Sequence, residues 1–212
     1  MARPTRTLLM RHGEVAAEWR TRIYGGFDVP LSPRGERQSR AAAAALAGAA
    51  TGPVIASGLG RTLALGLLLV DDPGELSCEA RLAEIDRGDW LGRTWDELDA
   101  QPAGGGGGPG AWKVWWGSGG RTRAPGGESL TDLKQRVLPA VRALVSEHAG
   151  QTLTLVAHSW VHRVLLATAL GLPVEGTMRF GLPTAGLAVL DWHTDGRVEL
   201  AGLRPGEIPK LS

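Results

Sequence analysis

The 212-residue sequence predicts an α/β fold, a three-layer sandwich in which a mostly parallel central sheet carries helices on both faces. Short apolar runs typical of buried strands, at residues 8–10, 53–56 and 153–157, are separated by longer segments with helical periodicity. Such alternation is the pattern of strands that are connected through helices. The first and the last of these runs each lead directly into a histidine, His12 and His158.

Length and composition favour one domain over residues 1–212. The formal net charge is +1 and the basic residues are scattered, which argues against a nucleic-acid partner. The single cysteine, Cys78, excludes an internal disulfide and is typical of a reducing compartment. No long apolar segment or signal sequence is evident. We therefore expect a cytoplasmic protein that binds no membrane, and a homodimer is compatible with this expectation.

The first half of the chain predicts a loop, two helices and a strand after the opening run. Residues 15–30 lack periodicity and contain glycine and proline, which indicates a loop. Ser32 is a suitable N-cap, followed by proline at the first helical position, so a helix is expected over residues 33–48. The strand at 53–56 then turns at 57–61 into a leucine-rich helix that reaches Val70.

The second half adds a long amphipathic helix and a strand that ends at His158. Apolar residues spaced by three or four follow Ser129, which can cap that helix. In chain order we expect an irregular segment at 81–90, a short helix at 95–100 behind a Thr94–Glu97 capping box, the long helix after Ser129, the strand at 153–157, a helix up to Leu170, and two final strands at 186–192 and 198–203.

A glycine-rich and tryptophan-rich segment occupies about residues 101–127. Five consecutive glycines, Gly104 to Gly108, cannot sustain regular structure. Three tryptophans follow within residues 112–116, ahead of two arginines. Two interpretations stay open: a mobile lid over a substrate, or a surface loop whose tryptophans pack on the body of the protein.

The two strand-end histidines indicate a phosphate site. Ligands of open α/β sheets bind at the carboxyl ends of the strands, so His12 and His158 are expected to face one crevice. Arg11 precedes His12, and Arg61 stands near the start of a helix at the same edge. Guanidinium groups bind phosphate bidentately, and a neutral imidazole can attack phosphorus. We expect a nucleophile, His12, beside an anion clamp.

Five stretches of the chain resemble the histidine phosphatase superfamily, which includes the cofactor-dependent phosphoglycerate mutases. They are LMRHGE at 9–14, YGGFDVPLS at 24–32, SGLGR at 57–61, the segment 82–92, and VAH at 156–158. Their order and spacing cover nearly the whole chain. The form of 24–32 and of PGGES at 125–129 is most similar to that of alpha-ribazole phosphatases.

This resemblance implies phosphoryl transfer through a phosphohistidine, with no cofactor and no metal. His12 would be the nucleophile, and Arg11, Arg61 and His158 would bind the phosphoryl oxygens. Glu84 would donate a proton to the leaving group and later activate water, with Asp86 and Asp89 as its rivals. A zinc site is not expected, because His158 and His162 lack the glutamate that follows the first histidine of such helices.

The expected function is hydrolysis of a small phosphate ester, with alpha-ribazole 5'-phosphate or another aromatic nucleoside monophosphate preferred over 3-phosphoglycerate. Indole rings offer flat faces to an aromatic leaving group. The candidate substrate contacts are Tyr24, Trp112, Trp115, Trp116 and Trp160. A phosphoglycerate mutase is the alternative, disfavoured by the short stretch between Glu84 and Ser129. A catalytically weak binding or regulatory protein is a further alternative, because Trp160, Val15 and Glu18 depart from the family pattern.

Overall fold

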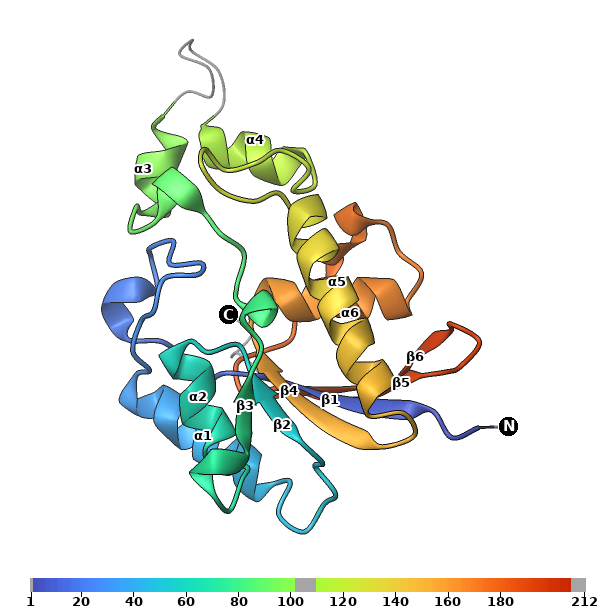
Figure 1. Ribbon diagram of the computed structural model, residues 1–212. Helices are drawn as coiled ribbons and strands as arrows, with labels where there is room; N and C mark the ends of the chain where they lie inside the picture. The colour runs from blue at the N-terminus through green and yellow to red at the C-terminus, as the bar shows by residue number, and fades with distance from the viewer. Residues whose placement is uncertain (1, 102–109, 207–212) are drawn as a thin grey trace.

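The computed structural model describes residues 2–101 and 110–206. Its strands are β1 Thr5–Arg11, β2 Val54–Ala56, β3 Leu76–Cys78, β4 Thr152–Ala157, β5 Leu187–Trp192 and β6 Val198–Arg204. They form one sheet in the order β3-β2-β4-β1-β5-β6 (Figure 1). The strands β3, β2, β4 and β1 are parallel, whereas β5 runs antiparallel to β1 and β6 antiparallel to β5. The mostly parallel sheet expected from the sequence is confirmed.

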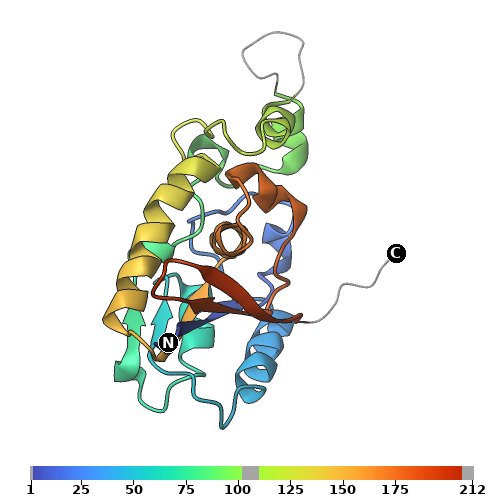
Figure 2. The ribbon, with the colours of Figure 1, turned by 90° about the vertical axis from the view of Figure 1, so that its right-hand side faces the viewer.

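Helices cover both faces of this sheet, as Figures 1 and 2 show. They are α1 Pro33–Ala44, α2 Gly60–Gly66, α3 Trp95–Asp99, α4 Ala111–Gly117, α5 Leu130–Glu147 and α6 Ser159–Ala169. Short 3-10 helices lie at Ala17–Trp19, Pro73–Glu75, Ala80–Leu82, Gly88–Trp90 and Val174–Arg179. Within β1, Leu9 packs into the core beneath α5 and α6, and Met10 into the core beneath α1 and α2. The three-layer arrangement follows from this alternation.

Local sequence signals predicted the starts of α1, α3 and α5 correctly. The Ser32 hydroxyl accepts the Gly35 N–H at 2.9 Å at the start of α1. Complete capping boxes open α3, with Thr94 and Glu97, and α5, with Ser129 and Asp132. These signals need only residues that are three apart in sequence, so no tertiary structure is required to recognise them.

Helix ends and two short elements differ from expectation. The first helix ends at Ala44 rather than Gly48, and the leucine-rich helix ends at Gly66 rather than Val70. Residues 83–87 are irregular, as expected for 81–90, and single 3-10 turns at Ala80–Leu82 and Gly88–Trp90 border them. Strand β3 was missed, because three residues that include serine carry no periodic signal.

The tryptophan-rich segment forms a helix instead of a loop. The glycines of 104–108 lie outside the described residues, and α4 begins directly after them at Ala111. Trp115 is only 1% exposed and belongs to the main core, whereas Trp116 is 47% exposed. Packing on the body, one of the two interpretations, thus describes Trp115. Motion of this segment as a lid stays a prediction.

Candidate active site

The register of the sheet brings the two histidines together. In the parallel pair β1·β4, Arg11 lies opposite Ala157, so His12 and His158 follow at neighbouring positions of the carboxyl edge. Their ring centroids are 5.2 Å apart. The two strand ends therefore lie side by side, as expected. The two histidines are 146 positions apart in the sequence, and the pairing of β1 with β4 brings them together.

His12 is held as a neutral ring with one bare nitrogen. It is 2% exposed, and its Nδ1 lies 2.7 Å from the Gly13 carbonyl oxygen. Because a carbonyl only accepts, Nδ1 carries the proton and Nε2 keeps a free lone pair. Burial, followed by the charges of Arg11 and Arg61, lowers the pKa of His12 well below its ordinary value. The ring therefore remains an uncharged nucleophile in mildly acidic solution as well.

Close backbone packing fixes the turn that carries His12. A Cβ on Gly13 would stand 2.1 Å from the Gly35 carbonyl oxygen, so no side chain fits between this turn and the start of α1. On the other side, the Ala185 N–H donates to the His12 carbonyl at 3.1 Å. Ala185 does this from a left-handed backbone conformation with φ of 56°. An alanine in that conformation is strained by about 1–2 kcal/mol.

His158 is oriented by a chain of hydroxyl groups that sequence reasoning missed. Thr62 Oγ1 donates to the Leu59 carbonyl at 2.7 Å, so the Ser57 hydroxyl donates to Thr62 Oγ1 at 2.9 Å. Ser57 Oγ must then accept from Nε2 of His158, at 2.7 Å. This leaves Nδ1 of His158, which is buried without a partner, as the nitrogen available to a ligand.

Replacing Ser57 by alanine should test this chain. The change leaves the Nε2–H of the fully buried His158 ring without an acceptor, and an unsatisfied buried donor costs about 1–3 kcal/mol. We expect a drop of that size in the free energy of unfolding, measured with urea, and about tenfold lower kcat/KM. Thr62→Ser, which keeps the terminal hydroxyl, is the matched control. Equal stability of Ser57→Ala and the parent would show that the chain does not orient His158.

Two arginines flank His12, of which Arg61 is buried and Arg11 is partly buried. Arg61 is 1% exposed and donates to the carbonyls of Gly25 and Phe27, at 2.7 and 2.8 Å, from opposite terminal nitrogens. Arg11 donates to the Leu182 carbonyl at 2.7 Å. The Nε atoms of both arginines are buried without a hydrogen-bond partner. Backbone carbonyls thus hold the guanidinium planes while part of their donor capacity stays uncommitted.

Glu84 lies against the start of α6. Both of its carboxylate oxygens accept the Trp160 N–H at 3.3 Å, and Oε1 also accepts the Ile85 N–H at 3.0 Å. The side chain is 7% exposed, whereas its rivals Asp86 and Asp89 are exposed. Tyr24 is partly buried nearby, where burial raises its pKa and Arg11, Glu84 and Arg61 act on it electrostatically. Glu84 is thus the buried one of the three candidate carboxyls, and it binds the backbone two residues beyond His158.

Most candidate aromatic contacts are already occupied by protein groups. Trp115 stacks on Trp112 at 5.0 Å, its ring centroid lies 4.2 Å from the Arg87 guanidinium, and the residue is only 1% exposed. Trp160 lies near Arg87 at 5.5 Å and Arg163 at 4.7 Å. Trp115 therefore offers no free face to a substrate. The sequence analysis also gave no role to Arg87, because an arginine in a loop is usually solvated.

His162 is a buried base without a partner. It is fully buried, and neither ring nitrogen has a hydrogen-bond partner. Burial, and next the charge of Arg11, lower the pKa of His162 to about 3 from 6.5. His162 is therefore a packing residue of α6 and not a helix-surface residue.

Acid should therefore destabilise the protein through His162. Below pH 6.5 His162 is protonated in the unfolded chain but stays neutral in the folded protein. The free energy of unfolding therefore decreases as the pH falls towards 3. Each pH unit costs about 1.4 kcal/mol at this group. We expect His162→Leu to flatten the pH dependence of urea unfolding by that slope. An unchanged slope, or the same flattening in His148→Leu at the end of α5, would contradict the assignment.

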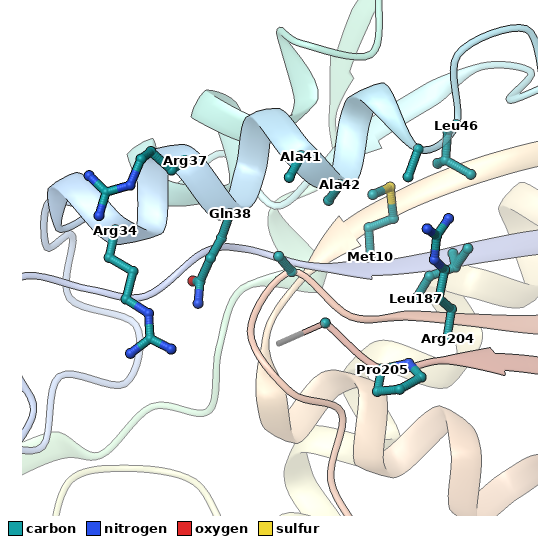
Figure 3. A pocket seen from close by; sticks show the side chains of 13 residues that line it. Met10, Arg34, Arg37, Gln38, Ala41, Ala42, Leu46, Leu187, Arg204 and Pro205 are labelled. Carbon is teal, nitrogen blue, oxygen red and sulfur yellow. The ribbon is translucent and has the colours of Figure 1, made fainter. Parts of the chain in front are cut away.

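A separate cavity of about 590 Å³ lies between α1 and the start of β5. Figure 3 shows Arg34, Arg37 and Arg204 around it and Met10 beneath it. Neither histidine nor Glu84 lines this cavity, so it is distinct from the site at the strand ends. Its links to that site are structural: Gln38 accepts the Glu14 N–H at 2.9 Å, and Arg34 pairs with Glu14 at 3.6 Å.

Two features are absent from the described residues, 2–101 and 110–206. No group of three or more potential metal ligands occurs among them. None of the helices in that part of the chain combines the length and the apolar composition that a bilayer span requires.

Known proteins share both the sequence pattern and the fold. A glucosyl-3-phosphoglycerate phosphatase of Mycolicibacterium vanbaalenii is 34% identical over 94% of this chain and 85% of its own. A protein of Enterobacter sp. named "Probable phosphoglycerate mutase GpmB" is 32% identical over 92% of this chain and 91% of its own. The chain is thus similar to proteins with two different activities.

Solved structures agree. A mycobacterial glucosyl-3-phosphoglycerate phosphatase in complex with VO3 superposes with a TM-score of 0.80 at 28% identity, covering 94% of this chain and 99% of that one. The alpha-ribazole phosphatase of Shigella flexneri superposes with a TM-score of 0.83 over 98% and 100%, and at 24% identity this shows a shared fold. The family described as histidine phosphatase superfamily, branch 1, matches residues 7–202. The chain therefore belongs to the histidine phosphatase superfamily, branch 1.

Proposed function

We propose that the protein is a phosphomonoesterase that hydrolyses a small phosphate ester through a phosphohistidine on His12. One observation carries the proposal: a neutral His12 with a bare Nε2 stands among buried, unpartnered nitrogens of Arg11, Arg61 and His158. Unpaired buried polar atoms are costly unless a ligand satisfies them. The oxygens of a tetrahedral phosphoryl group would accept from the arginine nitrogens, and a proton on that group would be donated to Nδ1 of His158.

The reaction would proceed in two displacements. Nε2 of His12 attacks phosphorus and the bond from phosphorus to the ester oxygen breaks, while Glu84 gives its proton to that oxygen. Water then attacks the phosphohistidine, Glu84 takes a proton from the water, and inorganic phosphate leaves. The arginines would stabilise charge on the equatorial oxygens in both transition states.

His158 favours a phosphoryl group that brings a proton. Its Nε2–H is committed to Ser57, and burial followed by the charges around it lowers the pKa of His158 well below the ordinary value. The neutral ring therefore presents a bare Nδ1, which can accept the proton of a phosphate monoanion. This supports the acid phosphatase type of chemistry.

The substrate can be identified by assaying a panel of phosphate esters. Alpha-ribazole 5'-phosphate is the finer expectation from the motif forms at 24–32 and 125–129. The relative of 34% identity instead carries the name of a glucosyl-3-phosphoglycerate phosphatase. We expect release of inorganic phosphate from p-nitrophenyl phosphate and from at least one of these metabolites. Interconversion of 3- and 2-phosphoglycerate without net phosphate release would reassign the protein as a mutase.

Exhaustive chelation should leave hydrolysis unchanged. The proposed steps use only imidazole, guanidinium and carboxyl groups, so EDTA removes none of the reacting groups. Initial rates with p-nitrophenyl phosphate before and after dialysis against EDTA give the answer. A loss of activity that one added divalent ion restores would overturn the metal-independent mechanism.

A further inference from the structure

The Arg87 side chain is enclosed by tryptophans beside Glu84. It is 3% exposed, and its guanidinium centre lies 4.2, 5.4 and 5.5 Å from the ring centroids of Trp115, Trp112 and Trp160. Trp160 also supplies the N–H that binds the Glu84 carboxylate. The aromatic rings therefore hold a cation at the edge of the active site, in the place where an aromatic leaving group was expected to stack.

Arg87 keeps its charge but lacks a full set of partners. Burial lowers the pKa of Arg87 only to about 10, so the group is cationic at neutral pH. Its NH1 atom is buried without a hydrogen-bond partner. The carboxylates that act on it are Glu84 and Glu128, and Glu128 already binds both Nε and NH2 of Arg136, at 2.7 and 2.8 Å.

A second arginine shares this environment. Arg163 projects from α6 and lies 4.7 Å from the Trp160 ring centroid. It donates to the Thr177 carbonyl at 2.9 Å, while its Nε is buried without a partner. Glu84 is the carboxylate that acts on it. Arg87 and Arg163 thus share one carboxylate, the same group that must give its proton to the leaving group.

The two arginine pairs divide between the two halves of an ester. Arg11 and Arg61 flank His12 and suit the phosphoryl group. Arg87 follows Glu84 by three residues, and Glu84 by its proposed role marks the ester oxygen of the leaving group. A leaving group that carries a negative charge would neutralise the positive charges of Arg87 and Arg163 at this end of the site.

We infer that Arg87, supported by Arg163, binds a carboxylate on the leaving group, so that the substrates are phosphate esters of hydroxy acids. This inference rests on the proposed phosphatase function. A guanidinium whose NH1 is uncommitted can donate to a carboxylate and matches its charge. A nucleoside-like leaving group would bring no charge to this position.

The test compares two esters that differ at one group. D-3-Phosphoglycerate and sn-glycerol 1-phosphate have the same arrangement at C2 and differ only in that the first carries a carboxylate where the second carries a hydroxymethyl group. We expect the parent protein to prefer 3-phosphoglycerate by at least about tenfold in kcat/KM, the size of one charge-assisted contact. In Arg87→Gln the ratio should fall by about tenfold through KM. Arg121→Gln, at an exposed arginine paired with Glu175, is the matched control and should keep the ratio.

The outcomes separate the inference from the proposed function. A parent ratio near one, or a ratio unchanged in both Arg87→Gln and Arg163→Gln, overturns the carboxylate site even if hydrolysis is fast. Hydrolysis of neither ester nor of p-nitrophenyl phosphate refutes the phosphatase instead. In that event, calorimetric affinities of the two esters for the parent and for Arg87→Gln still decide the inference. Selective loss of 3-phosphoglycerate affinity supports it, and an equal change for both esters contradicts it.

Discussion

Replacement of His12 by alanine is expected to reduce kcat for p-nitrophenyl phosphate by at least about 10⁴-fold, the order of loss when a covalent catalyst loses its nucleophile. The bare Nε2 of His12 is the atom that would form the bond to phosphorus, and no neighbouring group replaces it. His158 presents a nitrogen too, but the ring is fixed by Ser57 and its centroid lies 5.2 Å from that of His12.

Two measurements accompany this prediction. Acid quenching of the parent protein during turnover of a ³²P-labelled ester should trap acid-labile phosphate, and the His12→Ala protein should trap none. His148→Ala removes an imidazole at the end of α5 and should retain parental activity. If His12→Ala were folded by circular dichroism and still turned over within about tenfold of the parent, the phosphohistidine mechanism would be wrong.

Glu84→Gln should separate the two displacements. For an alkyl phosphate, the loss of the proton donor slows the first step, and we expect about 10²–10⁴-fold lower kcat. For p-nitrophenyl phosphate, whose leaving group needs no proton, the first step stays fast while attack of water slows. We therefore expect a burst of nitrophenolate, one per protein molecule, followed by slow turnover. The amide can still accept the Trp160 N–H, so the local structure is kept.

The control for this prediction is an exposed carboxyl of the same segment. Asp89→Asn removes an exposed charge from the same segment and leaves the buried Glu84 in place. It should leave the hydrolysis rates of the alkyl and the aryl ester unchanged. Equal losses for the alkyl and aryl esters in Glu84→Gln, with no burst, would show that Glu84 is not the proton donor.

Local signals made most of the fold predictable. Apolar runs that lead into His12 and His158 mark β1 and β4, and caps at Ser32, Thr94 and Ser129 mark helix starts. The strand register then places Arg11 opposite Ala157, as two parallel strands that end together require. Short elements escape such reasoning, because β3 has three residues and α4 follows a glycine run.

Contacts between distant segments could not be predicted in the same way. The pair of Ser57 and His158 spans 101 positions, and nothing near Ser57 in sequence indicates it. Arg87 is a stronger case, since arginine is rarely buried and its enclosure depends on tryptophans from α4 and α6 together. The sequence pointed to the tryptophans, whereas the structure shows what they enclose.

The carbonyl contacts of Arg61 bear on how fast inorganic phosphate leaves. Gly25 and Phe27 already engage both terminal nitrogens of the guanidinium. Phosphate therefore competes with, or adds to, bonds that exist without it, and gains less than it would from a guanidinium freed from water alone. We therefore expect inorganic phosphate to inhibit weakly, because the carbonyls of Gly25 and Phe27 compete with it for the terminal nitrogens of Arg61. Rapid release of phosphate in this way would free the site for the next turnover.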